Sequence, residues 1–189
     1  MVRAWRRASP AIVAFWYGLE DAARAAIKQP GYAYTYTGKT GVEVTYFVQG
    51  DALYCRLPSG RLLTYQRPRL VPSFTPWGKP VEKITFEGWN SDYKRGPIGW
   101  VRMDTYGGKL CENWVQAVSR DILVHGMLGL EGAGYPIVLH VHDEPASEVP
   151  VGYGSVEQYE RIMTMPAPWF ATWPISAAGG WRGQRYRKD

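Results

Sequence analysis

The chain has 189 residues, of which 46% are hydrophobic and 21% are charged, a balance typical of folded domains and not of disordered chains. Twenty-two basic residues against seventeen acidic ones give a net charge of +5, which favours nucleic acid or another polyanion as a partner. No apolar run approaches the roughly 18 residues of a membrane helix, so no membrane partner is expected.

The chain is predicted to begin with a helical segment, residues 1–31. Ser9 and Pro10 form a good helix start, because a hydroxyl can cap the helix and proline suits its first turn. An apolar face follows, and the helix should run to about Lys28, before the Pro30–Gly31 stop. The basic residues ahead of the apolar stretch lack a cleavage site, so we do not interpret them as a signal peptide.

Residues 32–106 are predicted to be β-rich. Short β-branched and aromatic runs such as "GVEVTYFVQG", "ALYCRLP" and "VEKITFEG" are separated by turn residues. The stretch 67–80 contains four prolines and is predicted to be a loop or an extended link. Cys55 and Cys111 lie far apart and outside any CxxC motif, so both are expected to be reduced, which fits a cytoplasmic protein.

The last segment, residues 107–189, is predicted to contain a helix over 109–134 and two strands, 136–141 and 145–149, joined by a turn at 142–144. Ser155, with Gln158 three residues later, forms a capping box that opens a final helix. A basic, glycine-rich tail ends the chain. These elements together predict an α+β fold, an antiparallel β-sheet with packed helices, in one segment spanning 1–189.

The predicted turn, in "VLHVHDEPASEV", gathers the residues best suited to chemistry. His140 and His142 lie two apart on a strand, a spacing found in HxH metallohydrolases, but His125 is the only other histidine. Asp143 and Glu144 supply carboxylate oxygens of the kind that bind Mg²⁺. A solvated polar turn would use the same residues, so the motif alone leaves these interpretations open.

The long helix carries a stripe of donor side chains. Lys109, Asn113, Gln116 and Arg120 are spaced four, three and four apart, which places them on one helix face. A solvated face has this pattern, and so does a helix that contacts the sugars and minor-groove acceptors of DNA.

The two stretches "YGGKLCENWVQAVSRDIL" and "GYPIVLHVHDEPASEV" together resemble the end of the palm in family A DNA polymerases, the DNA polymerase I family, and are most similar to its bacteriophage-type members. In that family a helix with the pattern Q-x-x-x-x-D-I/L precedes a β-hairpin with His-Asp-Glu at its turn. Here the pattern consists of Gln116, Asp121 and Ile122, followed by His142, Asp143 and Glu144. "LPSGRLLTY" and "GGWRGQRYRK" also resemble the phage-type group.

The resemblance implies a role for each matched residue. Asp143 would be the motif C aspartate, a ligand of the two catalytic Mg²⁺ ions, and Glu144 would be its acidic neighbour. His142 would lie near the primer 3′ end and Gln116 would contact the minor groove of the primer–template, with support from Asn113 and Lys109. Arg120 has no clear counterpart. The implied reaction is two-metal nucleotidyl transfer from deoxynucleoside triphosphates during DNA replication.

Two elements of the family pattern are absent from the sequence. No D-[YF]-S-Q-I-E string supplies the second aspartate, and no R-x-x-x-K helix supplies the nucleotide-gripping lysine. The stretch "RRASPAIVAFWYG" has Ala11 where that lysine should be. We therefore expect a truncated or split polymerase that is inactive alone, that needs an N-terminal polypeptide, and that exposes apolar surface favouring self-association. The rival hypotheses are a non-enzymatic DNA-binding or interaction protein and an HxH metallohydrolase.

Overall fold

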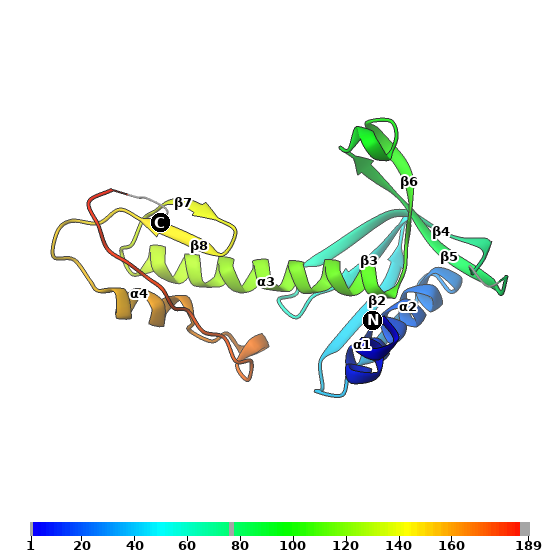
Figure 1. Ribbon diagram of the computed structural model, residues 1–189, viewed down its shortest axis with the longest axis horizontal. Coiled ribbons are helices and arrows are strands. Elements are labelled where there is room, and N and C mark those ends of the chain that lie inside the picture. Colours follow the sequence, from blue (N-terminus) through cyan, green and yellow to red (C-terminus); the bar gives the residue numbers. More distant parts are fainter. Residues whose placement is uncertain (1, 76–77, 186–189) are drawn as a thin grey trace. The chain divides into compact units, whose positions relative to one another are not determined.

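The computed structural model describes residues 2–75 and 78–185, and it confirms the predicted α+β class (Figure 1). By internal contacts the chain divides into two compact units, Met1–Ala117 and Val118–Asp189. The first unit contains two helices, a six-stranded sheet and a short 3-10 helix: α1 (Val2–Ala8), α2 (Pro10–Lys28), β1 (Ala33–Thr37), β2 (Glu43–Gln49), β3 (Ala52–Arg56), β4 (Leu62–Phe74), β5 (Pro80–Asn90), η1 (Tyr93–Arg95) and β6 (Gly99–Thr105). The helix α3 (Gly107–Gly132) begins in this unit and ends in the second.

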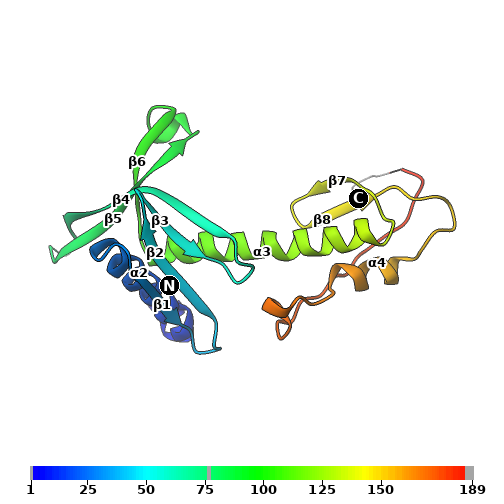
Figure 2. The ribbon, with the colours of Figure 1, turned by 180° about the vertical axis from the view of Figure 1, so that it is seen from behind.

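The sheet of the first unit is an antiparallel meander in which strands β1 to β6 are neighbours in chain order. Helix α2 packs on β1 and β2, and the tip of the β5–β6 hairpin projects away from α1 and α2, as the view from behind also shows (Figure 2). The core between helix and sheet is apolar and fully buried, and includes Leu19, Ala23, Val44 and Leu53. Burial of such side chains is the main favourable term in folding.

The start of α2 at Pro10 and its end at Lys28 agree with the sequence. The Ser9 hydroxyl, however, makes no capping hydrogen bond, and a separate helix α1 precedes it. The prediction of one N-terminal helix was therefore incomplete.

The prediction of a loop or link over 67–80 was wrong for residues 67–74, which belong to β4, and for Pro80, where β5 begins. Strand β3 pairs only with residues 62–66 of β4, so the rest of β4 has one strand neighbour, β5. Proline lacks the amide hydrogen that a second neighbour would require, and it is tolerated where a strand edge is free. Pro68 and Pro72 lie in this half-paired part, and Pro76 lies outside the described residues.

The beginning of α3 is fixed by contacts with α2. The Glu20 carboxylate accepts a hydrogen bond from the amide of Gly107 at 2.8 Å, and Arg24 holds that carboxylate at 2.6 Å. A carboxylate at a helix N-terminus satisfies an unpaired amide and interacts favourably with the helix dipole. On α3, four residues are buried, Leu110, Trp114, Ala117 and Val118, while Ile122 and Met127 are half-buried.

The second unit contains the C-terminal half of α3, the two-stranded sheet β7 (Ile137–Val141) and β8 (Glu144–Ser147), helix α4 (Val156–Met163) and η2 (Pro168–Phe170). The hairpin lies alongside α3 (Figure 1) and is built around a small core of Leu130, Tyr135 and Ile162. Gly126 permits α3 and α4 to approach closely, since a Cβ there would lie 2.7 Å from the Met163 carbonyl oxygen.

Both cysteines are free thiols, as predicted, with Cys55 buried and Cys111 half-buried. Within residues 2–75 and 78–185, no helix is both long enough and apolar enough to cross a membrane.

Candidate active site

The predicted hairpin is present, and its turn is a two-residue loop formed by His142 and Asp143. His142 has φ +54°, in the left-handed region, where histidine is enriched among non-glycine residues. Strained backbone of this kind persists where the surrounding structure holds it. His142, Asp143 and Glu144 are all exposed, so the turn presents an imidazole and two carboxylates to solvent.

The base of the hairpin is held by tyrosine hydroxyls. Tyr159 of α4 donates a hydrogen bond to the Pro145 carbonyl at 3.2 Å, and its hydroxyl lies 3.0 Å from that of Ser147. The Ser147 hydroxyl also donates to the Tyr135 carbonyl at 3.2 Å. These contacts tie β8 to α4 only a few residues from Asp143. Burial raises the pKa of Tyr159, so this tyrosine stays a neutral donor at ordinary pH.

Replacing Tyr159 by phenylalanine removes both hydroxyl contacts and leaves the ring packing. We expect the free energy of unfolding of the second unit to fall by about 1–2 kcal/mol, since a net hydrogen bond contributes about 1 kcal/mol. Amide hydrogen exchange of residues 144–147 should accelerate, and chemical denaturation gives the stability change. Tyr153→Phe, which alters a tyrosine that contacts the Ala133 carbonyl instead, is the control and should leave exchange in β8 unchanged.

The geometry does not complete a metal site within the described part of the chain. Among these residues, no group of three or more His, Cys, Asp and Glu side chains is arranged to hold a metal ion. His140 lies on β7 and is exposed, like His142, but no third ligand joins them. The two adjacent carboxylates, Asp143 and Glu144, remain as oxygen donors for a hard cation that retains water.

The donor stripe on α3 is partly engaged by the protein. The Asn113 amide donates to the Tyr65 hydroxyl at 3.2 Å, and Lys109 forms an ion pair with Glu112 at 3.2 Å. Gln116 is exposed, and its side chain forms no hydrogen bond with any residue that the structure describes. Gln116 is therefore the most available donor of the three that the resemblance assigned to DNA contact.

An apolar surface lies open on the second unit, between α3 and β7. It forms an open groove lined by side chains of both elements, including Val124, Met127, Leu128, Val138 and Leu139. Leu128 and Val138 are 67% and 62% exposed. Large exposed apolar surfaces of this kind mark sites where another protein element packs. The expectation that part of the apolar surface is uncovered agrees with this groove.

Sequence reasoning missed the residues that position the hairpin. The sequence analysis singled out neither Tyr135 nor Tyr159, although the Tyr159 hydroxyl contacts β8 and the Tyr135 hydroxyl contacts α4. Half of the predicted capping box is confirmed, because the Ser155 hydroxyl accepts a hydrogen bond from the Gln158 amide at 3.1 Å. The Gln158 side chain instead accepts from the Tyr135 hydroxyl at 2.7 Å. The close approach of α4 at Gly126 could have been predicted, because a glycine inside a helix is costly unless another backbone approaches it.

Comparisons with known proteins give one informative relative. The whole of this chain is 39% identical to part of a protein described as "DNA polymerase" from Bacillus phage SP02. The chain spans 27% of that relative's length. No family model matches the chain, and no solved structure matches it. Over all of its 189 residues, therefore, the chain is similar to a segment of a phage DNA polymerase.

Proposed function

We propose that this chain is the C-terminal palm segment of a family A DNA polymerase of the bacteriophage type and that it contributes to template-directed DNA synthesis. The observation that carries the proposal is the 39% identity, over the whole chain, to part of a phage DNA polymerase. The hairpin supports it, because the exposed His142 and Asp143 form its turn and Glu144 directly follows, the arrangement that the resemblance implies. Two free cysteines fit the proposed cytoplasmic location.

In this proposal Asp143 binds catalytic Mg²⁺ and Glu144 lies beside it. Two adjacent carboxylates open to solvent suit an ion that retains several waters, but they are too few to form a complete site. When bound, Mg²⁺ would neutralise charge on the phosphate being transferred. The remaining carboxylate would come from the part of the polymerase that this chain lacks, so we propose that the chain is inactive alone.

The residues around the carboxylates would bind and orient DNA. His142, fixed by the turn, would contact the primer end, and Gln116 would donate to minor-groove acceptors of the primer–template. Asn113 would act chiefly through Tyr65, and Lys109 would add positive charge. The apolar groove between α3 and β7 would receive the N-terminal polypeptide of the polymerase, and in its absence the same surface would favour self-association.

A chimeric polymerase tests this proposal. The matching segment of the phage SP02 protein is replaced by this chain, and primer extension with Mg²⁺ and deoxynucleoside triphosphates is measured. We expect extension by the chimera and none by the isolated chain. Asp143→Ala should lower the extension rate by two orders of magnitude or more, because a ligand of the reacting ion is lost. Glu148→Ala, which removes another exposed carboxylate beyond β8, is the control.

Three results would count against parts of the proposal. An Asp143→Ala chimera as active as its parent would exclude the metal-ligand role. Robust extension by the isolated chain would contradict its proposed inactivity. A chimera that folds and binds DNA but never extends a primer would favour the rival hypothesis of a non-enzymatic DNA-binding protein. That rival has its own support, since residues 1–117 contain sixteen Lys and Arg against nine Asp and Glu, a net charge of +7.

A further inference from the structure

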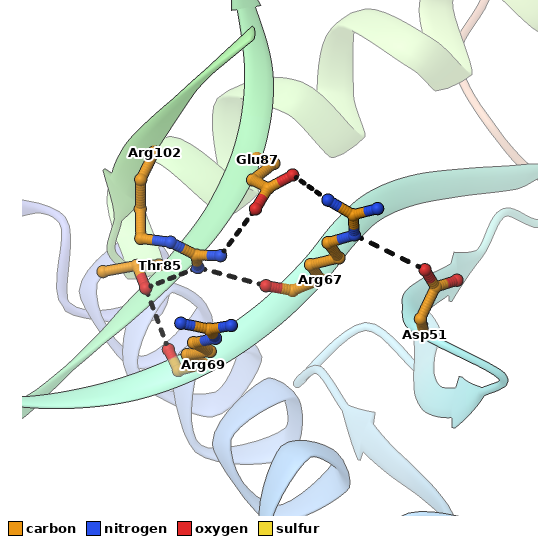
Figure 3. Close-up of polar contacts among 6 residues, drawn as sticks. All are labelled: Asp51, Arg67, Arg69, Thr85, Glu87 and Arg102. Atoms are coloured by element: carbon orange, nitrogen blue, oxygen red, sulfur yellow. Dashed lines mark hydrogen bonds and ion pairs between the residues drawn. The ribbon is translucent and has the colours of Figure 1, made fainter.

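One face of strands β4, β5 and β6 carries a cluster of arginines on the first unit. Figure 3 shows Arg67, Arg69 and Arg102 gathered around Glu87 and Thr85. Strand pairing places Arg102 opposite Glu87 and Arg69 opposite Thr85, so the cluster draws on three neighbouring strands. The other side of the same strands turns toward the core, where Phe86 packs edge-on against Tyr65 at 5.1 Å. The arginine face is therefore the solvent side of the sheet.

A β-bulge places Arg69 on the same face of the sheet as Glu87. From Gln66, opposite Glu87, to Arg69, opposite Thr85, β4 advances three residues while β5 advances two, so Arg69 lies on the side opposite to the buried Tyr65. The pairing of β4 with β5 shifts register between Gln66 and Arg69, and Arg67 has φ +45° within the bulge. A bulge bends a strand and redirects a side chain that regular alternation would place elsewhere. The left-handed conformation of an arginine that precedes a proline is costly, and such strain is concentrated at functional sites.

The three arginines of the cluster outnumber the two carboxylates that pair with them. Glu87 bridges Arg67 at 3.0 Å and Arg102 at 3.1 Å, and Asp51 lies 3.7 Å from Arg67. Arg102 is fixed further by hydrogen bonds to the Arg67 carbonyl and the Thr85 hydroxyl at 3.1 and 3.2 Å. The exposed guanidinium of Arg69 forms no ion pair or hydrogen bond with any residue in the described ranges, and no dashed line reaches it in Figure 3.

Two exposed tryptophans continue this face toward the tip of the hairpin. Trp89 and Trp100 are cross-strand partners, with ring centroids 6.2 Å apart and planes at 84°. They are 58% and 64% exposed, a large apolar area to leave in water. Each lies two residues beyond a member of the charged cluster, Glu87 on β5 and Arg102 on β6, a step of about 6.6 Å along a strand.

The tip that follows the tryptophans is ordered by one buried amide. The Asn90 side chain donates to the carbonyls of Asp92, Gly96 and Pro97 at 3.1, 3.2 and 2.9 Å. This loop displays the ring of Tyr93, 74% exposed, with the Lys94 ammonium 6.0 Å from its centroid. The Trp rings thus lie on paired strands and the Tyr93 ring on a loop that is held by hydrogen bonds. Such ordering before binding lowers the entropy lost when a ligand binds.

We propose that this face, defined by Arg67, Arg69, Trp89, Trp100 and Arg102, binds single-stranded DNA. Exposed rings beside guanidinium groups match the stacking of unpaired bases and the contact of their phosphates. Duplex bases already stack on one another and offer only their edges, so the rings select a single strand. The free Arg69 and the net charge of +7 on residues 1–117 favour a polyanion over a protein partner. The site consists of residues of the first unit, whereas the hairpin belongs to the second, and the proposal does not depend on the hairpin's proposed chemistry.

The test is fluorescence anisotropy of a labelled 20-nucleotide oligo-dT with the full chain at several salt concentrations. Trp89→Leu with Trp100→Leu keeps apolar bulk but removes the indole rings, and the Kd should rise roughly fivefold to hundredfold, since stacking contributes about 1–3 kcal/mol per base. Arg69→Ala should reduce the slope of log Kd against log salt by about 0.7, the value for one phosphate contact on a single strand. Arg69→Lys should retain that slope.

Matched controls come from the same sheet. Phe74→Leu changes an aromatic residue that is 71% exposed at the far end of β4, and Lys39→Ala removes an exposed charge near β1. Both should bind oligo-dT like the parent chain, and circular dichroism should show that all variants fold. A Kd unchanged in the double tryptophan variant, or no binding of oligo-dT at about 100 μM chain, would overturn the proposal and leave the face to a protein partner. Because this assay needs no catalysis, it is unaffected if the chimera fails to extend primers.

Discussion

We expect the first unit to lose most of its stability between pH 9 and pH 12. Burial raises the pKa of the Cys55 thiol from 9.0 to about 12 and that of the Tyr65 hydroxyl from 10.0 to about 12. Burial also raises the pKa of Tyr46, and Cys55 beside it adds to this effect. All three groups are neutral when protonated, and water solvates their anions far better than the core does.

The direction of the effect follows from which state releases protons first. Below pH 9 both the folded and the unfolded chain keep these protons, so the stability is fully present. Above pH 9 the unfolded chain releases the Cys55 proton while the folded chain retains it to about pH 12, which favours unfolding. Each pH unit between the unfolded and folded pKa values corresponds to about 1.4 kcal/mol. Cys55 therefore contributes about 4 kcal/mol and Tyr65 about 3 kcal/mol to this loss of stability. That loss is comparable to the whole stability of many domains.

Urea denaturation followed by circular dichroism at pH 8, 10 and 11, with a reductant present, measures this loss. Cys55→Ala should cost about 1 kcal/mol at pH 8 but should make the stability less sensitive to pH above 9. Cys111→Ala is the control, because burial raises the pKa of this thiol too, but the side chain is only half-buried. Equal stability of the parent chain at pH 8 and pH 11 would contradict the prediction. Assays of DNA binding and primer extension should accordingly be run below pH 9.

Replacing Gly107 by alanine should destabilise the first unit by about 2–3 kcal/mol, whereas the same change at Gly108 should be neutral or slightly stabilising. A Cβ at Gly107 would overlap the carbonyl oxygen of Trp16, which belongs to the backbone of α2 and cannot rotate away. The start of α3 would have to shift, and the hydrogen bond from Gly107 to Glu20 would weaken. Overpacking of this kind typically costs about 1–3 kcal/mol, and the lost capping contact adds to it.

Gly108 is the matched comparison because it lies one residue further in the same helical turn. A Cβ there would lie 2.9 Å from the ring of Tyr106, but that ring is 64% exposed and can move. Alanine is also favoured over glycine by up to about 1 kcal/mol inside a helix. Thermal denaturation of the two variants compares their stabilities. Equal stabilities would show that α2 does not fix the start of α3. In the Gly107 variant of the chimera, extension should fall as well, because a shift at the start of α3 would also displace Gln116 on the same helix.

How far the sequence predicts this molecule depends on the range of the interactions involved. Helix α2, the Ser155 cap and the hairpin turn follow from patterns within a few residues, and all three were predicted close to where they lie. The exposure of Asp143 and Glu144 also follows locally, because Asp143 lies in the tight turn of a hairpin and Glu144 directly follows it. Their roles come from the resemblance and remain proposals.

The parts that the sequence did not predict depend on neighbours distant along the chain. The proline-rich stretch became strand because β5 pairs with it while β3 ends early, and no local rule contains that information. Asn113 was predicted only as a DNA contact, but folding places it against the Tyr65 hydroxyl, 48 residues away in sequence. The arginine and tryptophan face likewise exists only once the bulge and the register of β4, β5 and β6 are set. Composition and local pattern determined which helices, turns and carboxylates this chain has, and strand pairing decided which of its side chains meet.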